Sequence, residues 1–334
     1  MAQVLKVAMV GLGWWGRKMT SLLQERSEAL RVVRAVEPRI DGARTFAADY
    51  GISLSETLAD ALNDPLVEAV ILATPHSAHE SQIEAAVKAK KHVFCEKPLA
   101  LTREGAHRAV TLCREAGLVL GMGHERRFEP PVSAMIDACA SGALGRLLQI
   151  EANFSHDKFL GLDPDNWRLQ PEHAPAAGMT ATGIHLTDLA VKLMGPAKEV
   201  LVTCEQLASG LPSGDTLSAL CRFRDGGTAY ISASLATPFV SRFAVFGTKG
   251  WIDIRDRAHV EAPDGWIVTQ GRAGEAITIS EVPRAEPVLT NLEAFARAVR
   301  GGAYPITGEE MVDNIALLEA IIRGAKSRRL ENVK

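Results

Sequence analysis

Aromatic residues, cysteines and an excess of positive charge are all scarce in this sequence. Aromatic residues make up only 5% of the 334 residues. The five cysteines are widely spaced and form no CxxC pair, which argues against a disulfide framework and against a thiolate zinc site. Lys and Arg number 37 and Asp and Glu number 40, so there is no surplus of positive charge to bind a nucleic-acid backbone. The sequence therefore predicts reduced thiols and no nucleic-acid partner.

The sequence also lacks a hydrophobic run long enough to cross a bilayer. The longest run, from Val67 to Thr74, contains Glu68 and is far shorter than the ~20 residues that a membrane span needs. The first residues lead directly into an apolar strand, without the basic region, long apolar region and small-residue cleavage site of a signal peptide. We therefore expect a cytoplasmic protein with no membrane partner. The length predicts two domains.

Residues 1–123 alternate short apolar runs with longer helical stretches, a pattern typical of a parallel sheet with crossover helices. The predicted strands are 4–11, 30–37, 69–75, 92–98 and 118–123, and the clearest predicted helices are 78–90 and 103–116. Most of these strands end at Gly, Pro or a polar residue, where ligand-binding loops lie in such sheets. We therefore predict a first, α/β domain over residues 1–123.

The pattern changes in residues 124–334, which form the second predicted domain. Longer alternating runs predict antiparallel strands at 146–155, 199–207, 218–236 and 241–255, with hairpin turns at 225–227 and 248–250. Helices are predicted near 131–141 and at 184–194, 289–300 and 308–326. The last two are long enough to cover the sheet or to pack back on the first domain.

A glycine-rich motif follows the first predicted strand and precedes a helical stretch. Its glycines are Gly11, Gly13 and Gly16, with Trp14 and Trp15 between the second and the third. In a GxGxxG motif the glycines allow a tight turn, close approach of a diphosphate and close helix packing. The motif therefore predicts a dinucleotide site. The tryptophans are candidates for cofactor contact or for the substrate entrance, with a core anchor for the helix as the alternative.

The identity of the dinucleotide depends on the end of the second strand. Glu37 lies 21 residues after Gly16, where a carboxylate accepts hydrogen bonds from the adenosine ribose and repels a 2′-phosphate. NAD is therefore the predicted cofactor. Arg39 is of a residue type that binds a 2′-phosphate, so NADP stays open as an alternative.

Two further segments lie at the predicted carboxyl ends of parallel strands. The cofactor-site candidates there are Thr74, Pro75, His76 and His79 after the third strand, and Glu96 and Lys97 after the fourth. The Lys97 ammonium at this edge can bind a substrate hydroxyl and stabilise a developing alkoxide. His76 and His79 have no acidic or thiol partner at a familiar ligand spacing, so we predict no metal.

The motifs together resemble the glucose-fructose oxidoreductase and inositol dehydrogenase family, often called Gfo/Idh/MocA. The resemblance is carried by GLGWWG, ATPHSAH, CEKPL, GHERRF (123–128), NWR (166–168) and GIHLTDL (183–189), and spans nearly the whole chain. It implies a Rossmann domain with a doubly wound parallel sheet, followed by an α+β domain with an open, mostly antiparallel sheet. It also implies homodimers or homotetramers, and hydride exchange between a nicotinamide and a secondary alcohol of a sugar, cyclitol or related ring.

The resemblance assigns Lys97 and His185 as the catalytic pair, with His185 as general acid and base. An unperturbed imidazole pKa near 6.5 suits proton transfer in both directions. Asp188 follows on the same helical pattern, where it would orient the imidazole or bind substrate, with a helix-surface aspartate as the alternative. The other substrate-site candidates are His124, Arg126, Arg127, Trp167, Arg168 and Thr182.

One position departs from the family pattern. Many sugar and inositol dehydrogenases of the family have an aspartate four residues before the histidine, whereas this chain has Ala181 between Thr180 and Thr182. A hydroxyl forms hydrogen bonds but does not replace a carboxylate base. This position therefore leaves open a non-sugar ring such as a cis-dihydrodiol, or reduction of a carbonyl with NADPH. The nearby cations favour an anionic ring such as a sugar acid as a further alternative. A non-catalytic dinucleotide-binding sensor is the alternative from another class of protein.

Overall fold

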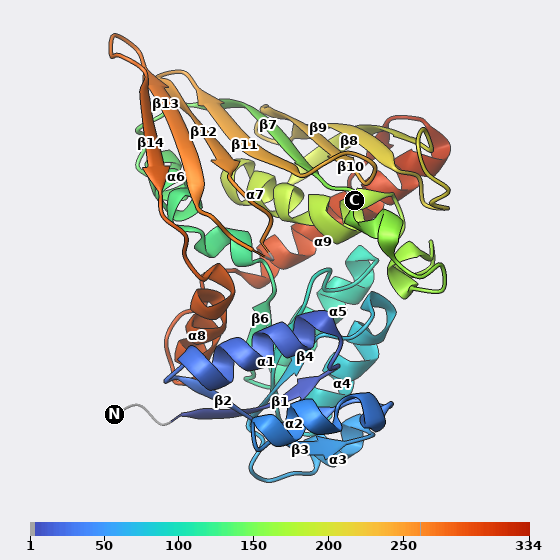
Figure 1. The fold of residues 1–334 in the computed structure, drawn as a ribbon. Helices are drawn as coiled ribbons and strands as arrows, with labels where there is room; N and C mark the ends of the chain where they lie inside the picture. Colours follow the sequence, from blue (N-terminus) through green and yellow to red (C-terminus); the bar gives the residue numbers. More distant parts are fainter. Residues whose placement is uncertain (1–3, 261) are drawn as a thin grey trace. The chain divides into compact units, whose positions relative to one another are not determined.

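The computed structural model describes residues 4–260 and 262–334 and divides into two compact units. Unit 1 runs to Glu125 and also includes Val288–Val312, and unit 2 comprises Arg126–Pro287 and Asp313–Lys334 (Figure 1). The segment Val288–Val312 therefore belongs to unit 1, although in sequence it follows the main part of unit 2.

Unit 1 is built on a six-stranded parallel sheet with strand order β3-β2-β1-β4-β5-β6. Its strands are β1 (Leu5–Val10), β2 (Leu30–Val36), β3 (Ser53–Ser55), β4 (Ala69–Leu72), β5 (His92–Cys95) and β6 (Leu120–Met122). Its helices are α1 (Trp14–Arg26), α2 (Arg44–Asp49), α3 (Leu58–Leu62), α4 (His79–Lys88), α5 (Arg103–Glu115) and α8 (Pro287–Val299), with short turns η1 (Ile40–Gly42) and η2 (His76–Ala78). The order reverses between β1 and β4, so the doubly wound Rossmann sheet is confirmed.

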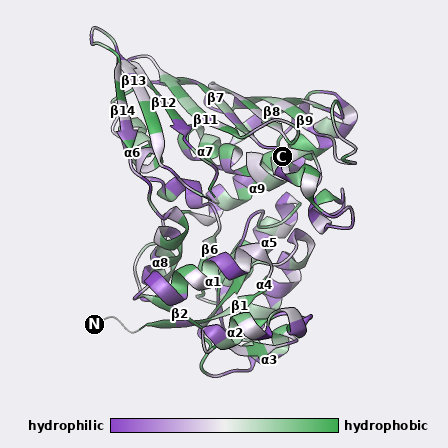
Figure 2. Ribbon diagram, in the orientation of Figure 1, coloured by the Kyte–Doolittle hydropathy of each residue, from purple (hydrophilic) through white to green (hydrophobic). Residues whose placement is uncertain are grey.

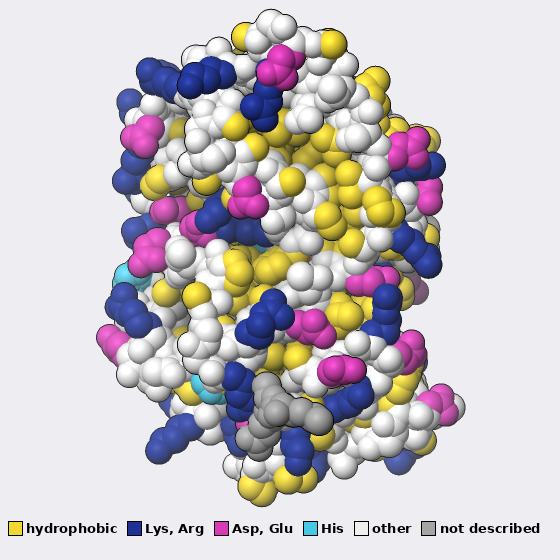
Figure 3. Space-filling view, turned by 90° about the vertical axis from the view of Figure 1, so that its left-hand side faces the viewer, with side chains coloured by type: hydrophobic (Ala, Val, Ile, Leu, Met, Phe, Trp, Pro, Cys, Tyr) yellow, Lys and Arg dark blue, Asp and Glu magenta, His cyan; other side chains and the backbone are white. Residues whose placement is uncertain are grey.

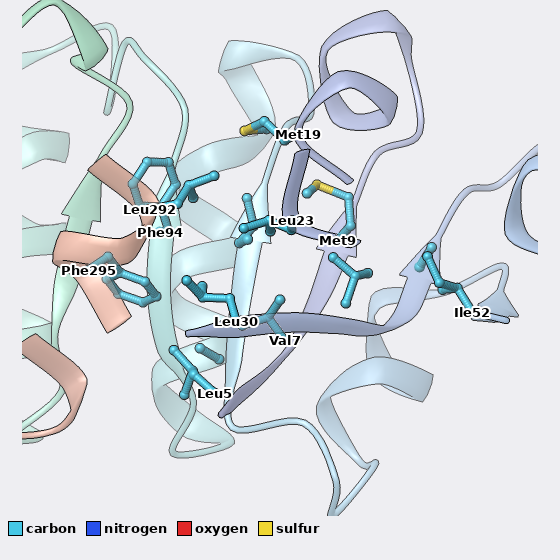
Figure 4. Close-up of a cluster of buried hydrophobic side chains, with 14 of the residues drawn as sticks. Leu5, Val7, Met9, Met19, Leu23, Leu30, Ile52, Phe94, Leu292 and Phe295 are labelled. Carbon is cyan, nitrogen blue, oxygen red and sulfur yellow. The ribbon is translucent and has the colours of Figure 1, made fainter. Parts of the chain in front are cut away.

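Burial explains why the inner strands of unit 1 are apolar along their length. A parallel sheet with helices on both faces buries every side chain of its central strands, and all four residues of β4 are buried. Hydrophobic residues accordingly mark these central strands in Figure 2. Figure 4 shows the resulting core, in which Leu5, Met9 and Phe94 from the sheet share one cluster with Leu292 and Phe295 from α8. Helix α8 is therefore part of the core of unit 1.

Unit 2 is built on a nine-stranded sheet with strand order β14-β13-β12-β11-β7-β10-β9-β8-β15. Its strands are β7 (Leu147–Ser155), β8 (Ala197–Glu205), β9 (Thr216–Phe223), β10 (Thr228–Ser234), β11 (Val240–Gly247), β12 (Gly250–Asp256), β13 (Trp266–Arg272), β14 (Thr278–Val282) and β15 (Glu331–Asn332). Only β7 and β10 pair in parallel, so the predicted mostly antiparallel sheet is confirmed. Its first hairpin, β9–β10, turns at the predicted glycines, with Gly226 at φ +106°.

The helical elements of unit 2 lie on one side of this sheet (Figure 1). They are α6 (Pro130–Ala140), α7 (Ile184–Met194) and most of α9 (Gly308–Ser327), with the short turns η3 (Glu125–Phe128), η4 (Lys158–Gly161), η5 (Trp167–Leu169) and the π-helical turn η6 (Met179–Gly183). Strand β10 shows the alternation that such one-sided cover requires: Ala229 and Ile231 are buried, whereas Tyr230 is exposed. The sheet therefore has a covered face and an open face.

The structure differs from the sequence prediction at the strand ends. Residues 73–75 and 96–98 were predicted as strand, but β4 ends at Leu72 and β5 at Cys95. The extra residues form irregular loops at the carboxyl edge of the sheet, where residues contact ligands rather than neighbouring strands. Strands β3, β13, β14 and β15, helices α2 and α3, and the turn η6 were not predicted.

Candidate functional site

The glycine-rich loop of unit 1 joins β1 to α1, and two of its glycines are required by packing. Gly11 has φ +94°, and a Cβ atom there would lie 2.8 Å from the carbonyl oxygen of Ala73. A Cβ atom at Gly16 would lie 1.9 Å from the carbonyl oxygen of Gly11. A Cβ atom at Gly13, by contrast, would meet nothing within 4 Å. The start of α1 is therefore open at Gly13 and can accept a diphosphate against its N–H groups.

Trp14 and Trp15 occupy different surroundings in the first turn of α1. Trp14 is 52% exposed, whereas Trp15 packs against the core cluster of unit 1. Their ring centroids lie 5.2 Å apart, and the Lys18 ammonium lies 5.8 and 5.4 Å from the two rings. Trp15 therefore anchors the helix, while Trp14 offers an aromatic surface beside the glycine-rich loop.

Glu37 follows β2 directly, and its carboxylate is held against the glycine-rich loop. Its Oε2 accepts a hydrogen bond from the N–H of Leu12 at 3.1 Å, and its Oε1 accepts one from the N–H of Arg39 at 3.3 Å. Arg39 itself is exposed. The carboxylate is thus placed where an adenosine ribose would be bound in a Rossmann site.

His79 connects the loops that follow β4 and β5. Its Nδ1 lies 2.8 Å from the carbonyl oxygen of Pro98, and its Nε2 lies 3.1 Å from that of Thr74. The ring is fully buried, and this burial lowers the pKa of His79. The ring therefore joins the loop after β5 to the loop after β4, which also carries Pro75 and the buried His76 of η2.

Glu96 is a buried carboxyl group beside Lys97. Burial and the nearby Glu125 raise the pKa of Glu96 to about 7, although Lys97 and the Trp15 indole act in the opposite direction. Oε2 of Glu96 also accepts a hydrogen bond from the N–H of Lys97 at 3.3 Å. Sequence reasoning missed Glu125, whose only signal was an acidic residue inside the basic GHERRF motif.

In unit 2, His185 is the second residue of α7 and is only 3% exposed. The π-helical turn η6 precedes it, and π-helical turns are frequent at functional sites. The hydroxyl group of Thr182 donates to the carbonyl oxygen of Gly178 at 2.8 Å, and that of Thr180 donates to the carbonyl oxygen of Pro175. Both hydroxyl protons beside Ala181 are therefore used within the protein.

Arg127 and Asp188 form a buried, bidentate ion pair in unit 2. Both nitrogen–oxygen distances are 2.7 Å, and Asp188 is 1% exposed. The interpretation of Asp188 as a helix-surface residue is therefore wrong, because α7 turns it toward η3. Arg126 is likewise buried, and it donates to Ser241 and Asp256, each at 2.8 Å.

The remaining substrate-site candidates are distributed over both units. In η5, the guanidinium of Arg168 stacks on the Trp167 ring at 4.4 Å, and burial lowers the pKa of Arg168. His124 is 1% exposed and belongs to unit 1, together with Lys97. His185, Trp167 and Arg168 belong to unit 2.

Residues 4–260 and 262–334 contain neither a metal-binding cluster nor a membrane-spanning helix. No group of three or more His, Cys, Asp and Glu side chains in these ranges is arranged to hold a metal ion. None of the helices within the same ranges combines the length and the apolar composition of a membrane span.

Family models match both parts of the chain. Residues 5–124 match the model described as an oxidoreductase family with an NAD-binding Rossmann fold. Residues 132–253 match the GFO/IDH/MocA C-terminal domain. The first match spans the glycine-rich loop and Lys97, and the second spans η6 and His185.

Characterised proteins resemble the chain over nearly its full length. The chain is 31% identical to 1,5-anhydro-D-fructose reductase from Ensifer adhaerens over 92% of this chain and 93% of the relative. It is 28% identical to scyllo-inositol 2-dehydrogenase (NAD(+)) from Bacillus subtilis (strain 168), over 98% and 95% of the two chains. Aldose-aldose oxidoreductase from Caulobacter crescentus shares the fold, with a TM-score of 0.87, 24% identity and coverage of 99% and 100%.

Proposed function

Because the chain belongs to the GFO/IDH/MocA family of NAD-binding oxidoreductases, we propose that it transfers hydride between a nicotinamide and a secondary alcohol or ketone of a cyclic polyol. The substrate class is a sugar, a cyclitol or a related ring, as in the names of its relatives. The observation that carries the proposal is the glycine-rich loop, open at Gly13 and flanked by the Glu37 carboxylate. This arrangement suits a dinucleotide and supports redox chemistry rather than simple ring binding.

The cofactor in this proposal is NAD. In this proposal Glu37 accepts hydrogen bonds from the two hydroxyl groups of the adenosine ribose and disfavours a 2′-phosphate. The exposed Arg39 is of a residue type that binds such a phosphate, so NADP is the alternative. Trp14 and the loop of Thr74, Pro75 and His76 complete the cofactor side. Trp15, His79 and Glu96 support it from within unit 1.

The proposed proton transfer is assigned to His185 and the proposed stabilisation of an alkoxide to Lys97. When bound, NAD accepts the hydride in alcohol oxidation, or donates it as NADH in ketone reduction. In oxidation, Nε2 or Nδ1 of neutral His185 takes the hydroxyl proton, and in reduction the imidazolium returns it. In unit 1, the proposed role of the Lys97 ammonium is a hydrogen bond that stabilises a developing alkoxide.

The remaining substrate-site candidates fall into two groups, according to whether their charges are paired within the protein. We assign Arg127, Asp188 and Arg126 to supporting the substrate side, because their charges are already paired within unit 2. Trp167 and Arg168, as a stacked pair, and His124 and Thr182 stay substrate-binding proposals. A guanidinium on an aromatic face suits a ring hydroxyl or a carboxylate.

Ala181 supports a second candidate within the same chemistry. This position has no carboxylate, whereas many sugar and inositol dehydrogenases of the family have an aspartate here. The hydroxyl protons of the neighbouring threonines are already engaged within the protein. In this proposal a cis-dihydrodiol or a sugar acid depends less than a neutral polyol on a carboxylate at this position. Turnover measured over a panel of these substrates distinguishes the classes.

We also propose that the protein is cytoplasmic and forms a homodimer or a homotetramer through the open face of the nine-stranded sheet. An exposed sheet face with apolar residues favours self-association.

The test is a nicotinamide absorbance assay over sugars, inositols, sugar acids and cis-dihydrodiols, with NAD and NADP in turn. We expect turnover with NAD, and a loss of about 10²–10⁴-fold in kcat for His185→Ala with cofactor affinity retained. The matched control is His107→Ala, which removes an exposed histidine of α5 and is expected to keep kcat. Unchanged turnover in His185→Ala would contradict the proton-transfer role. Cofactor binding without turnover on any ring would favour the sensor alternative.

A further inference from the structure

Two consecutive alanines precede the π-helical turn and have left-handed backbone conformations. Ala176 has φ +59° and Ala177 has φ +49°, and both are buried. A Cβ atom disfavours this conformation by a factor of about five to thirty in population for each residue. Such strained residues persist only where the surrounding structure holds them, and they gather at functional sites.

The segment that holds these alanines is the loop of residues 206–215, between β8 and β9. The N–H of Ala177 donates to the carbonyl oxygen of Ser213 at 2.9 Å. The hydroxyl group of Ser213 donates to the carbonyl oxygen of Ala174, also at 2.9 Å. Ser213 therefore bonds to the strained segment through both its backbone and its side chain.

Asp215 organises the 206–215 loop from its C-terminal end. Its fully buried carboxylate accepts hydrogen bonds from the N–H groups of Leu207, Ala208 and Ser209 at 3.1, 2.9 and 2.7 Å. The hydroxyl groups of Ser209 and Thr216 add two more bonds at 2.9 Å. Burial alone would raise the pKa of Asp215, but these donors hold it well below its usual range, so the carboxylate stays charged.

The backbone of Asp215 also fixes the loop to the sheet. Its N–H donates to the carbonyl oxygen of Glu205 at 2.9 Å, and its carbonyl oxygen accepts from the N–H of Leu235 at 2.8 Å. The position of Ser213 is thus defined by the sheet through Asp215.

The strained segment in turn sets the start of the helix that carries His185. The N–H of Met179 donates to the carbonyl oxygen of Ala176 at 3.0 Å, and the hydroxyl group of Thr182 donates to that of Gly178. Turn η6 is therefore bonded at both ends to residues 176–178. A change of φ at Ala177 would move η6 and, with it, the first turn of α7.

We propose that Ser213 and Asp215 are positioning residues for His185, because the 206–215 loop holds Ala176 and Ala177 in the left-handed conformation that places η6. The proposal rests on the proposed function for the role of His185. It assigns no contact with substrate to Ser213 or Asp215.

The test uses Asp215→Asn, and Ser213→Ala as a milder second variant in case the first fails to fold. Asp215→Asn replaces one acceptor oxygen with a donor and so loosens the 206–215 loop, whereas Ser213→Ala removes the bond to Ala174. We expect kcat to fall by about tenfold for Asp215→Asn, with the KM for NAD unchanged. Ala177→Gly in the same background is expected to restore kcat to within about threefold of wild type, because glycine adopts positive φ without penalty. A merely structural loop would show no such rescue.

Asp64→Asn is the matched control. Asp64 is also a loop carboxylate that accepts a backbone hydrogen bond, from Leu66 at 2.8 Å, but it lies in unit 1. We expect a comparable loss of thermal stability, an unchanged kcat and no rescue by Ala177→Gly. Equal kcat losses in Asp215→Asn and Asp64→Asn, or no rescue by glycine, would overturn the proposal.

Amide hydrogen exchange in the protein without cofactor separates this proposal from the proposed function. Exchange over residues 174–183 is expected to be about tenfold faster in Ser213→Ala and Asp215→Asn, and to slow again with Ala177→Gly. If no ring substrate is turned over but this pattern appears, the proposed function fails while the positioning of the segment stands. Unchanged exchange would overturn the positioning role whatever the activity.

Discussion

Among single residues, Glu96 shows most directly how unit 1 adjusts the charge beside Lys97. Its carboxyl packs against Gly123, where a Cβ atom would lie 2.7 Å from it, so water has little access. Burial and the proximity of Glu125 favour the protonated form, and the Lys97 ammonium opposes them. Near neutral pH the group therefore changes charge, which links the electrostatics of Lys97 to pH.

This raised pKa predicts a pH-dependent stability. The pKa of Glu96 is about 7 in the folded protein against an ordinary 4.5, so between these values the folded state keeps a proton that the unfolded state releases. Stability must therefore fall as pH rises through this window, by roughly 1–3 kcal/mol in total. We expect Glu125→Gln to reduce this fall, because it removes a negative charge that raises the pKa of Glu96. Urea unfolding at pH 5, 6, 7 and 8 measures how steeply stability falls with pH in the wild type and in Glu125→Gln.

Glu199→Gln is the control for this experiment. Glu199 is a buried carboxylate of β8 that is paired with Arg222 at 2.5 Å, in the other unit. Its replacement is expected to lower stability by a similar amount at every pH from 5 to 8 and to leave the slope unchanged. If Glu125→Gln also leaves the slope unchanged, Glu125 does not control the protonation of Glu96.

At the scale of elements, the sequence predicted those features that depend on local periodicity. The helix over 184–194 is confirmed as Ile184–Met194, because its apolar residues repeat at helical spacing. The hairpin turn around Gly226 is confirmed, because glycine at positive φ is a local requirement. Lys97 was predicted from its place at the end of a strand and His185 from the family resemblance, and their roles stay predictions.

Features that depend on distant partners were not predictable from the sequence. The bonds from the 206–215 loop to residues 174–177 join segments far apart in the sequence, and alanine gives no local signal for positive φ. The pairing of Arg127 with Asp188 joins residues 61 positions apart. Strand β14 is short and exposed, so it lacks the alternation that reveals a half-buried strand.

Helix α8 supplies a prediction about the core of unit 1. Phe295 is fully buried and contacts Phe94 edge to face, with ring centroids 5.7 Å apart. Phe295→Ala would leave a cavity in this core, so we expect a loss of about 3–5 kcal/mol in the free energy of unfolding. Urea unfolding followed by circular dichroism measures it. Leu66→Ala, at a leucine that is 55% exposed, is the control and is expected to change stability by less than about 0.5 kcal/mol.

If Phe295→Ala lost no more than the control, α8 would not share the core of unit 1. In that case the second stretch of unit 1, Val288–Val312, would be an appendage rather than part of the cofactor domain.

For the molecule as a whole, the proposed self-association depends on which side chains the open sheet face of unit 2 exposes. The cross-strand register places Leu201, Leu220 and Tyr230 in one row over β8, β9 and β10, and Leu201 and Tyr230 are 44% and 48% exposed. Arg242 on β11 lies beyond this row and bridges Glu151 and Asp253. The face therefore has an apolar part and a paired, charged part.

Other apolar side chains reach the surface at the edge of the same sheet. Ile277 and Ile279, just before and within β14, are 63% and 72% exposed. Figure 3 views the molecule from the side on which β14 lies in Figure 1 and shows hydrophobic side chains at the surface between charged ones. Exposed apolar area of this kind favours burial against a partner.

A second copy of the chain would bury the row of Leu201 and Tyr230 in an isologous interface, in which the same surface of both copies meets. The double substitution Leu201→Glu and Tyr230→Glu would place like charges in that interface without a counter-charge. We therefore expect it to weaken self-association by at least about tenfold, and to leave the fold intact because both side chains are half exposed in the single chain. Light scattering and sedimentation at micromolar concentration measure the change.

The control is Leu66→Glu, at a leucine of unit 1 that is also about half exposed, and it is expected to retain the assembly of the wild type. A monomeric wild type, or a double variant that assembles as the wild type does, would show that the open face is not the contact between copies.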